Sequence, residues 1–409
     1  MLVVGLLALA AAAVSASPVE RRQAQTIVLP LTHVSKFTSI KNIVNKGQQR
    51  INKVNGNVSP STEASSGSVT NEDVTYVAPV TIGGTTWQLI VDTGCKSLLQ
   101  YFRKLLRGST NSRCLLASNT WCGAQTSCEP TSTGKSTGGS VSVSYGSGEF
   151  SGNEYTDTVS FGGLTVTKQS IGAATSASGF QGVDGIIGFG PVDLTEDTVS
   201  NANTVPTFTD NLYSQGSIST EVLGVSFRPE SGSDTDDTNG ELTIGGTDSS
   251  KYSGTLTYFS KLTSGDASAY WGISIASFTY GSTTLSSGAS GIVDTGTTLI
   301  YIPTSAYNKF LSAAGGTTDS NSGLAEFSKA PTSNFGIKFG STTYTLTPSQ
   351  YLVPTAQYSY YGLTSGKYYA WINDGGSSGV NTIIGQKFLE NYYAVFDTTN
   401  SRIGFATGV

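Results

Sequence analysis

The sequence predicts an all-β protein built from two similar lobes. The chain of 409 residues contains 49 glycines, and only 12% of its residues are charged. Short runs alternate between apolar and polar residues, as at 141–144 and 343–346. Such alternation is typical of strands with one buried face. The length is sufficient for two domains, each with its own core.

A repeated segment supports the division into two lobes. Residues 89–94, Leu-Ile-Val-Asp-Thr-Gly, are similar to residues 291–296, Gly-Ile-Val-Asp-Thr-Gly. Each copy is followed further along the chain by Ile-Ile-Gly, at 186–188 and 383–385. Such internal similarity indicates repeated structural units. Each lobe therefore presents one aspartate, Asp92 or Asp294, at the end of an apolar strand.

The paired aspartates indicate acid–base hydrolysis. Cleaving a peptide without a metal or a covalent nucleophile requires a base for the water and an acid for the substrate. Two carboxylates held close together share one proton, because both cannot ionise at that separation, so the pair supplies both groups. Its pKa values belong to the pair, and activity is expected on the acid side. One Asp-Thr-Gly alone would indicate only a turn, whereas two copies behind matching strands predict a catalytic pair.

The distribution of histidine excludes other hydrolytic mechanisms. The only histidine is His33, near the N-terminus. The rest of the chain has no imidazole. It therefore cannot carry Ser-His-Asp or Cys-His catalysis, or a zinc site with histidine ligands. The acidic segment 233–241 has a glycine out of register for a calcium loop, so we interpret it as a solvated hairpin with an Asn239-Gly240 turn. The sequence thus predicts no metal and no cofactor.

Charge divides the chain into a basic leader and an acidic body. Residues 17–55 contain seven basic residues and one acid, whereas the chain from Gly56 onward contains 16 basic and 27 acidic residues. Such a leader can dock on the body by electrostatic attraction and be released when acid protonates the carboxylates. The alternative is a merely soluble basic linker. So acidic a body makes nucleic acid a poor partner.

The N-terminus has the features of a secretory signal peptide. Residues 1–17, MLVVGLLALAAAAVSAS, form an apolar run that ends in small residues, with Ala16 at a suitable cleavage point. No other stretch approaches membrane-spanning length, and residues 404–409 lack a lipid-anchor signal. We therefore expect a secreted, extracellular protein without membrane attachment. The predicted organisation is a signal peptide at 1–16, a propeptide at 17–65, an N-terminal lobe at 66–248 and a C-terminal lobe at 249–409.

Beyond Asn71 the sequence resembles the pepsin-like family of aspartic endopeptidases, most closely its fungal polyporopepsin branch. The resemblance implies the bilobal pepsin-like acid protease fold, with an active-site cleft between two β lobes. It also implies a monomer, inhibited by its own propeptide, that cuts polypeptides between bulky apolar residues. The stretches that carry the resemblance are 143–148, 182–188, 291–298 and 393–400.

The resemblance also implies roles for individual residues. Asp92 and Asp294 would bind the attacking water. The loop residues that would support them are Thr93, Gly94, Thr295, Gly296 and Thr297; the two threonines after the aspartates would tie the loops together, and Thr297 would bond to Asp294.

A second group would form the flap over the substrate. Tyr145 would stand at the tip of the flap, and Ser147 and Gly148 would bond to the substrate. Gly146, between Tyr145 and Ser147, also belongs to the flap. Trp121 would support the flap tyrosine, although the residue by itself predicts only core packing. Cys122 and Cys128 would form a disulfide like the small loop of related proteases.

The first catalytic loop contains an unexpected segment. The family expects Asp-Thr-Gly-Ser-Ser-Asn-Thr-Trp, but here residues 95–117 stand where one serine belongs, and they contain five basic residues and no acid. Cys95-Lys-Ser can be encoded with the splice donor GTAAGT, and Leu116-Ala with an acceptor AG. Excision would create a serine codon and restore Gly-Ser-Ser-Asn. We therefore interpret 95–117 as a retained intron; the alternative is a genuine loop insertion.

The insertion affects the predicted activity. Cys95 would replace the counterpart of Thr297, and a thiol is a weak hydrogen-bond donor. We expect little activity from the chain as written and expect the excised form to be the enzyme. The rival interpretations are a catalytically inactive protease-like binding or inhibitor protein, especially if 95–117 is retained, and a β-rich wall or carbohydrate-binding protein. The second gives no reason for paired Asp-Thr-Gly loops.

Overall fold

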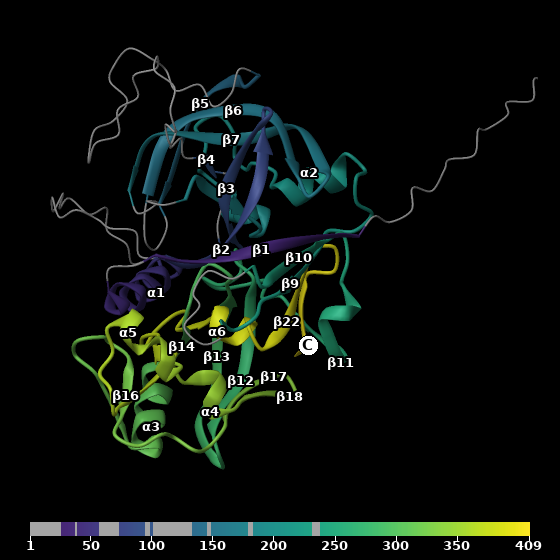
Figure 1. Ribbon diagram of the computed structural model, residues 1–409. Helices are drawn as coiled ribbons and strands as arrows, with labels where there is room; N and C mark the ends of the chain where they lie inside the picture. The colour runs from purple at the N-terminus through teal and green to yellow at the C-terminus, as the bar shows by residue number, and fades with distance from the viewer. Residues whose placement is uncertain are drawn as a thin grey trace, which may run out of the picture.

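The computed structural model describes residues 26–36, 39–56, 73–94, 99–100, 133–144, 149–178, 183–230 and 238–409. The protein is mostly sheet and has one lobe above and one below a layer of long strands (Figure 1). Among the described residues, no helix is long and apolar enough to cross a membrane. The predicted signal peptide, flap residues 145–148, Trp121, Cys122 and Cys128 lie outside the described residues.

The largest sheet joins the N-terminal lobe to the central layer. Its central strands come from both predicted lobes, because β22 pairs with β9, and β9 with β10. In order across the sheet the strands are β11 (Tyr252–Ser260), β23 (Arg402–Gly408), β22 (Tyr392–Asp397), β9 (Val222–Ser226), β10 (Gly240–Ile244), β1 (Ile27–Lys36), β2 (Asp73–Ile82), β3 (Thr85–Asp92), β8 (Gly185–Gly188), β4 (Leu99–Gln100), β7 (Leu164–Ser178), β6 (Glu149–Phe161) and β5 (Lys135–Ser144).

The C-terminal lobe has its own sheets and most of the helices. The larger sheet contains, in order, β18 (Thr342–Leu346), β17 (Phe335–Phe339), β12 (Gly272–Tyr280), β13 (Thr283–Val293), β21 (Thr382–Ile384), β14 (Ile300–Ile302) and β20 (Ile372–Asp374), and the smaller contains β15 (Gly316–Thr318), β16 (Ala325–Phe327) and β19 (Tyr368–Ala370). The helices after the leader are α2 (Phe208–Ser214), α3 (Thr304–Ala314), α4 (Pro348–Tyr351), α5 (Tyr358–Tyr361) and α6 (Gln386–Leu389), with 3-10 turns at Val192–Thr195, Ser249–Lys251 and Thr355–Gln357.

The basic leader is folded onto the body. Strand β1 lies between β10 and β2 and pairs antiparallel with both. Helix α1 (Ile40–Val54) follows; the Ser39 side chain caps its first turn by accepting from the Lys41 N–H. Its buried residues recur at helical spacing and pack on the C-terminal lobe. They are Ile40, Ile43, Val44, Gly47, Ile51 and Val54.

The two Asp-Thr-Gly segments end equivalent strands. β3 runs parallel to β8, and β13 runs parallel to β21. The next strand in each lobe is also equivalent, because β4 is antiparallel to β8 and parallel to β7, as β14 is to β21 and β20. β4 comes from the unexpected segment 95–117. In the chain as written, inserted residues thus occupy the position that β14 holds in the other lobe.

The predicted Asn239-Gly240 turn is wrong. Gly240 is the first residue of β10 and pairs with Leu31 of the leader strand. A type I′ turn needs a positive φ at this glycine, and Gly240 is not among the residues with one. The glycine is instead required by packing, because a Cβ there would lie 2.7 Å from the Tyr76 ring. The connection between β9 and β10 is therefore longer than the dipeptide indicated.

A buried carboxyl in the N-terminal lobe makes stability depend on pH. Glu154 on β6 is 3% exposed and accepts a hydrogen bond from the Ser170 hydroxyl. Burial raises its pKa from 4.5 to about 7, with the Ser170 bond opposing the shift. The folded chain therefore holds a proton that the unfolded chain releases above pH 4.5. The contribution of this proton to the free energy of unfolding is about 3 kcal/mol. It is fully present below pH 4.5 and is lost as the pH rises through 7.

We expect Glu154→Gln to remove much of this pH dependence. The amide keeps an acceptor for Ser170 and has no proton to lose. Between pH 4.5 and 8 the free energy of unfolding of the parent chain should fall by about 3 kcal/mol more than that of the variant. Chemical denaturation across this range measures the difference. Glu149→Gln is the control, because Glu149 is exposed on the same strand. Parallel profiles for the parent and Glu154→Gln would contradict the prediction.

Candidate active site

The two aspartates lie at the ends of buried strands. The last four residues of β3, which end at Asp92, are buried, and so are the last three of β13, which precede Asp294. The backbone of each aspartate is fixed by the neighbouring strand: the Asp92 carbonyl accepts from the Phe189 N–H at 2.9 Å, and the Asp294 N–H donates to the Ile384 carbonyl at 3.1 Å. The Ile-Ile-Gly repeats thus support the two aspartate loops.

Two threonines join the loops beneath the carboxylates. The Thr93 N–H donates to the Thr295 hydroxyl at 2.9 Å, and the Thr295 N–H donates to the Thr93 hydroxyl at 3.0 Å. The Thr295 hydroxyl donates in turn to the Val91 carbonyl, and the Thr93 hydroxyl to the Val293 carbonyl. Both threonines are fully buried. Four hydrogen bonds across the lobe boundary therefore fix one aspartate relative to the other.

The loop glycines allow each carboxylate to approach the opposite loop. A Cβ on Gly296 would lie 2.5 Å from the Asp92 carboxylate, and a Cβ on Gly94 would lie 2.7 Å from Asp294 Oδ1. No side chain fits at either position. The glycine of each Asp-Thr-Gly motif is thus required, because the carboxylate of the other loop lies where its side chain would be.

The two carboxylates are held by donors within their own loops. The Gly94 N–H donates to Asp92 Oδ1 at 2.8 Å, and the Gly296 N–H donates to Asp294 Oδ1 at 2.9 Å. The Thr297 hydroxyl donates to Asp294 Oδ2 at 2.5 Å. Asp294 is completely buried. Burial raises the pKa of Asp294; Arg50 opposes the shift and the charge of Asp92 adds to it.

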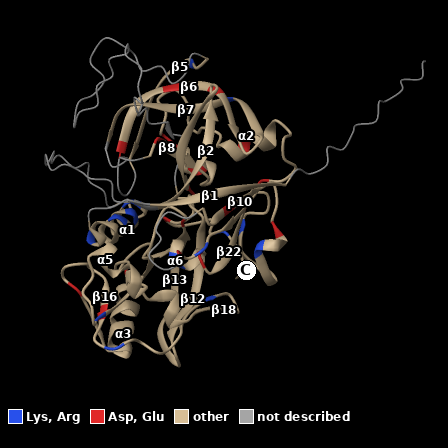
Figure 2. Cartoon of the chain, in the orientation of Figure 1, with Lys and Arg blue, Asp and Glu red and all other residues tan. Residues whose placement is uncertain are grey.

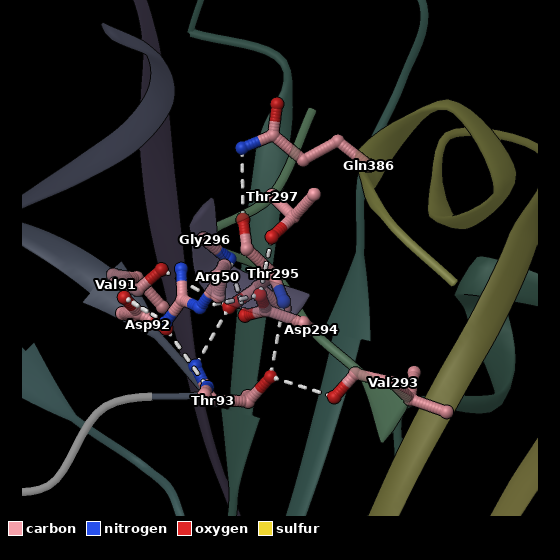
Figure 3. Close-up of polar contacts among 11 residues, drawn as sticks. Arg50, Val91, Asp92, Thr93, Val293, Asp294, Thr295, Gly296, Thr297 and Gln386 are labelled. Atoms are coloured by element: carbon pink, nitrogen blue, oxygen red, sulfur yellow. Dashed lines mark hydrogen bonds and ion pairs between the residues drawn. The ribbon is translucent and has the colours of Figure 1, made fainter. Parts of the chain in front are cut away.

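An arginine of the leader contacts both carboxylates. Arg50 Nη2 lies 2.8 Å from each oxygen of Asp92, and Arg50 Nε lies 2.9 Å from Asp294 Oδ2 (Figure 3). Its planar guanidinium presents donors in a fixed fork that suits carboxylates. The side chain is 13% exposed, so this contact is well shielded from water. Lys and Arg gather on α1 (Figure 2), and Arg50 is the one whose contacts join Asp92 to Asp294.

Polar contacts fix α1 at both ends. The Asn55 side-chain amide donates to the Val380 carbonyl at 2.8 Å and accepts from the Val380 N–H at 2.6 Å. Near the first turn, Lys41 Nζ donates to the Ser320 carbonyl at 2.9 Å. The leader strand carries a further ionisable contact, with His33 Nδ1 at 2.9 Å from Glu230 Oε1 in a buried site. The described part of the leader is therefore held both on its strand and at the two ends of its helix.

The structure brings together seven of the residues that the sequence singled out. These are Asp92, Thr93, Gly94, Asp294, Thr295, Gly296 and Thr297. Sequence reasoning missed Arg50, which it counted only as one of seven basic leader residues. It also missed Gln386, whose Nε2 donates to the Thr295 carbonyl at 2.8 Å. The signal in the sequence that could have indicated Gln386 was its position directly after the second Ile-Ile-Gly repeat.

Two β lobes whose Asp-Thr-Gly loops bond to each other, with both carboxylates facing one point, define a pepsin-like aspartic protease. The family model described as eukaryotic aspartyl protease matches residues 75–408, so the chain belongs to this family. It is therefore an aspartic-type endopeptidase with polypeptide substrates.

Individual relatives cover most of the chain. Polyporopepsin of Irpex lacteus is 45% identical over 349 residues, which cover 83% of this chain and 95% of that protein. Rhizopuspepsin-2 of Rhizopus niveus is 34% identical over 413 residues, covering 96% and 94% respectively. The solved structure of an aspartic proteinase from Irpex lacteus superposes with a TM-score of 0.74 at 38% identity and covers 94% of this chain and 98% of that one.

Proposed function

We propose that the chain is the secreted precursor of an acid-acting aspartic endopeptidase, kept latent by its own leader. The observation that carries the proposal is the contact of Arg50 with both Asp92 and Asp294. A substrate and its attacking water must reach the same two carboxylates. The guanidinium and the water therefore exclude each other.

The proposed chemistry needs only the two carboxyl groups. One carboxylate takes a proton from water while the other carboxylic acid donates a proton to the substrate carbonyl oxygen, and the pair later protonates the leaving nitrogen. Asp294 suits the protonated role, because burial and the charge of Asp92 raise its pKa. The threonine bonds hold the two groups in place before the substrate arrives, so little reorganisation is needed during the reaction.

Acid is the proposed trigger for release of the leader. Arg50 stabilises the charged form of Asp294, so the leader-bound state has a lower proton affinity at this pair than the leader-free state. By linkage, lowering the pH favours the leader-free state. Release would open the cleft and allow removal of residues 17–65 after the signal peptide has gone.

We expect Arg50→Ala to activate faster than the parent. Hydrogen bonds to charged groups contribute about 1.5–3 kcal/mol, so the lag before cleavage of a fluorogenic peptide should shorten by about 10- to 100-fold at a mildly acid pH. Stopped assays after a drop from pH 7, with mass spectrometry of the N-terminus, measure the lag and the cut point. Lys41→Ala is the matched control, because it removes one charge from the same helix near its first turn. An unchanged lag in Arg50→Ala would contradict the proposal that Arg50 keeps the precursor latent.

We also propose that residues 95–117 come from a retained intron and that the excised chain is the active enzyme. The composition of the segment and its splice-site codons support this proposal. The equivalence of β4 and β14 adds a structural argument, because two sequences then compete for one strand position. They are residues 99–100 in the chain as written and, after excision, the residues beginning at Thr120. The flap around Tyr145, the support from Trp121 and the Cys122–Cys128 disulfide belong to the proposed enzyme.

A further inference from the structure

Trp271 of the C-terminal lobe is bonded to the support of the first aspartate loop. The residue lies just before β12, is 3% exposed, and donates its indole Nε1–H to the Phe189 carbonyl at 2.9 Å. Phe189 directly follows β8 in the N-terminal lobe, and its N–H is the donor to the Asp92 carbonyl. The indole is therefore joined to the backbone of Asp92 through a single intervening residue.

The main chain of Trp271 holds the second aspartate loop. Its carbonyl accepts from the Val293 N–H at 2.9 Å, and Val293 directly precedes Asp294. Pairing between β12 and β13 begins at the next residue of the chain. One residue is thus bonded to the strand that carries Asp294 by its backbone and to the support of Asp92 by its side chain.

Packing fixes the indole in one orientation. Trp271 belongs to the main buried core, and its ring meets the ring of Phe396 on β22 edge-on, with centroids 5.2 Å apart. Its acceptor residue, Phe189, is also buried. Loss of the indole donor would take a hydrogen bond from a buried carbonyl, which is more costly than the net contribution of the bond itself.

The contacts of Trp271 differ from those of the threonines. The bonds between Thr93 and Thr295 join the residues that follow the two aspartates. Trp271 acts instead through the residue that precedes Asp294 and through the residue that supports the Asp92 carbonyl. A loop attached at one point can pivot about it, whereas a second attachment prevents the pivot. The separation of the two carboxyl groups therefore depends on both sets of bonds.

We propose that Trp271 is a positioning residue that sets the separation of Asp92 and Asp294 in the active enzyme. It acts through Phe189 and Val293 rather than on either carboxyl group. The inference rests on the proposed function, because it takes the aspartate pair as the catalytic group. Two carboxyl groups share one proton only while they are close, and a displacement of about 1 Å can lower a rate by about 10²-fold.

The width of the pH profile reports the separation of the carboxyl groups. The pair titrates in two steps, and each step produces one limb of a bell-shaped profile of kcat/KM. Carboxylates that are closer repel each other more strongly, so the two pKa values of the pair lie further apart. The charged groups that act on Asp294 are Asp92 and, while the leader is bound, Arg50. In the leader-free enzyme, a wider separation of the carboxyl groups should therefore narrow the profile.

Trp271→Phe tests the role of the indole, because it keeps an aromatic ring and removes the donor. After acid activation, kcat for a fluorogenic peptide should fall by about 10- to 100-fold, with KM within about twofold of the parent value. The kcat/KM profile should narrow by about one pH unit. Trp371→Phe is the matched control, because this buried tryptophan of the same lobe contacts Tyr361 and Lys387 instead of an aspartate loop. It should leave the width of the profile unchanged.

A second variant removes the N–H alone. Replacing the Trp271 side chain by that of benzothienylalanine keeps the fused rings and puts sulfur in place of the N–H, so it preserves the packing even if Trp271→Phe does not fold. The profile should narrow here too. The parent's width and kcat in this folded variant would overturn the inference and leave the proposed function standing. Cleavage by the parent that survives Asp294→Asn would overturn both.

Discussion

Replacing Asp294 by asparagine is expected to reduce kcat/KM for a denatured protein substrate by about 10⁴-fold or more, in whichever form of the chain is active. An amide neither shares a proton with Asp92 nor accepts one from water, so general acid–base catalysis, which contributes about 10²–10⁴-fold per group, is lost at both roles. The fold should persist, because the amide oxygen still accepts from the Gly296 N–H and the amide NH2 can donate to the Thr297 hydroxyl, which is able to act as acceptor.

The measurement is release of acid-soluble fragments after activation at low pH, with circular dichroism to confirm folding. Asp92→Asn should produce the same loss, since the pair acts as one unit. Asp266→Asn is the matched control, because this exposed aspartate lies outside the cleft loops. Activity within tenfold of the parent in Asp294→Asn would mean that the carboxyl pair does not carry the chemistry.

The repeat was sufficient to predict the arrangement of the aspartates. Each lobe has an equivalent strand that ends in Asp-Thr-Gly. When the two lobes pack against each other, this arrangement brings the two carboxylates together. The threonine bonds were expected from the family resemblance rather than from the repeat, and the close approach at Gly94 and Gly296 is visible only in the structure. The strand alternation likewise predicted the sheet class.

The leader contacts could not be predicted in the same way. Seven basic residues indicate attraction to an acidic body, but attraction does not select one of them. Arg50 is selected by the register of α1, which depends on the burial of Ile43, Ile51 and their neighbours against the C-terminal lobe. The position of β1 between β10 and β2 is a pairing between segments far apart in the chain. Gly240 misled the prediction because a glycine required by a neighbouring ring has the same local sequence as one required by a turn.

The second large effect concerns residues 95–117. Replacing them by a single serine is expected to raise the activity of the acid-treated chain by at least about 10²-fold. The restored serine would donate to Asp92 as Thr297 donates to Asp294, and removal of one such donor from an active site typically costs about 10²–10³-fold. Replacement would also remove the five basic residues of the segment from the chain directly after the Asp92 loop.

The spacing along the chain gives a structural reason for the same expectation. Ile300 follows Asp294 by six residues and begins β14, which pairs with β21. After excision, Thr120 would follow Asp92 by the same six residues, and Trp121 would take the position equivalent to Tyr301. In the chain as written, Leu99 and Gln100 hold the pairing with β8 instead. Two segments cannot occupy one strand position, so the inserted chain and the excised chain differ in the sequence of the strand that pairs with β8.

The experiment compares the two chains, each with and without Asp294→Asn, in the same assay of acid-activated cleavage. A third chain, in which residues 95–117 are replaced by a glycine–serine linker of equal length, separates the effect of the inserted sequence from that of loop length. Activity only in the serine-replaced chain, lost with Asp294→Asn, supports the intron. Equal activity in the serine-replaced and unaltered chains would instead make the segment a tolerated loop. Independently, a mature transcript that still encodes 95–117 would contradict the proposal of a retained intron.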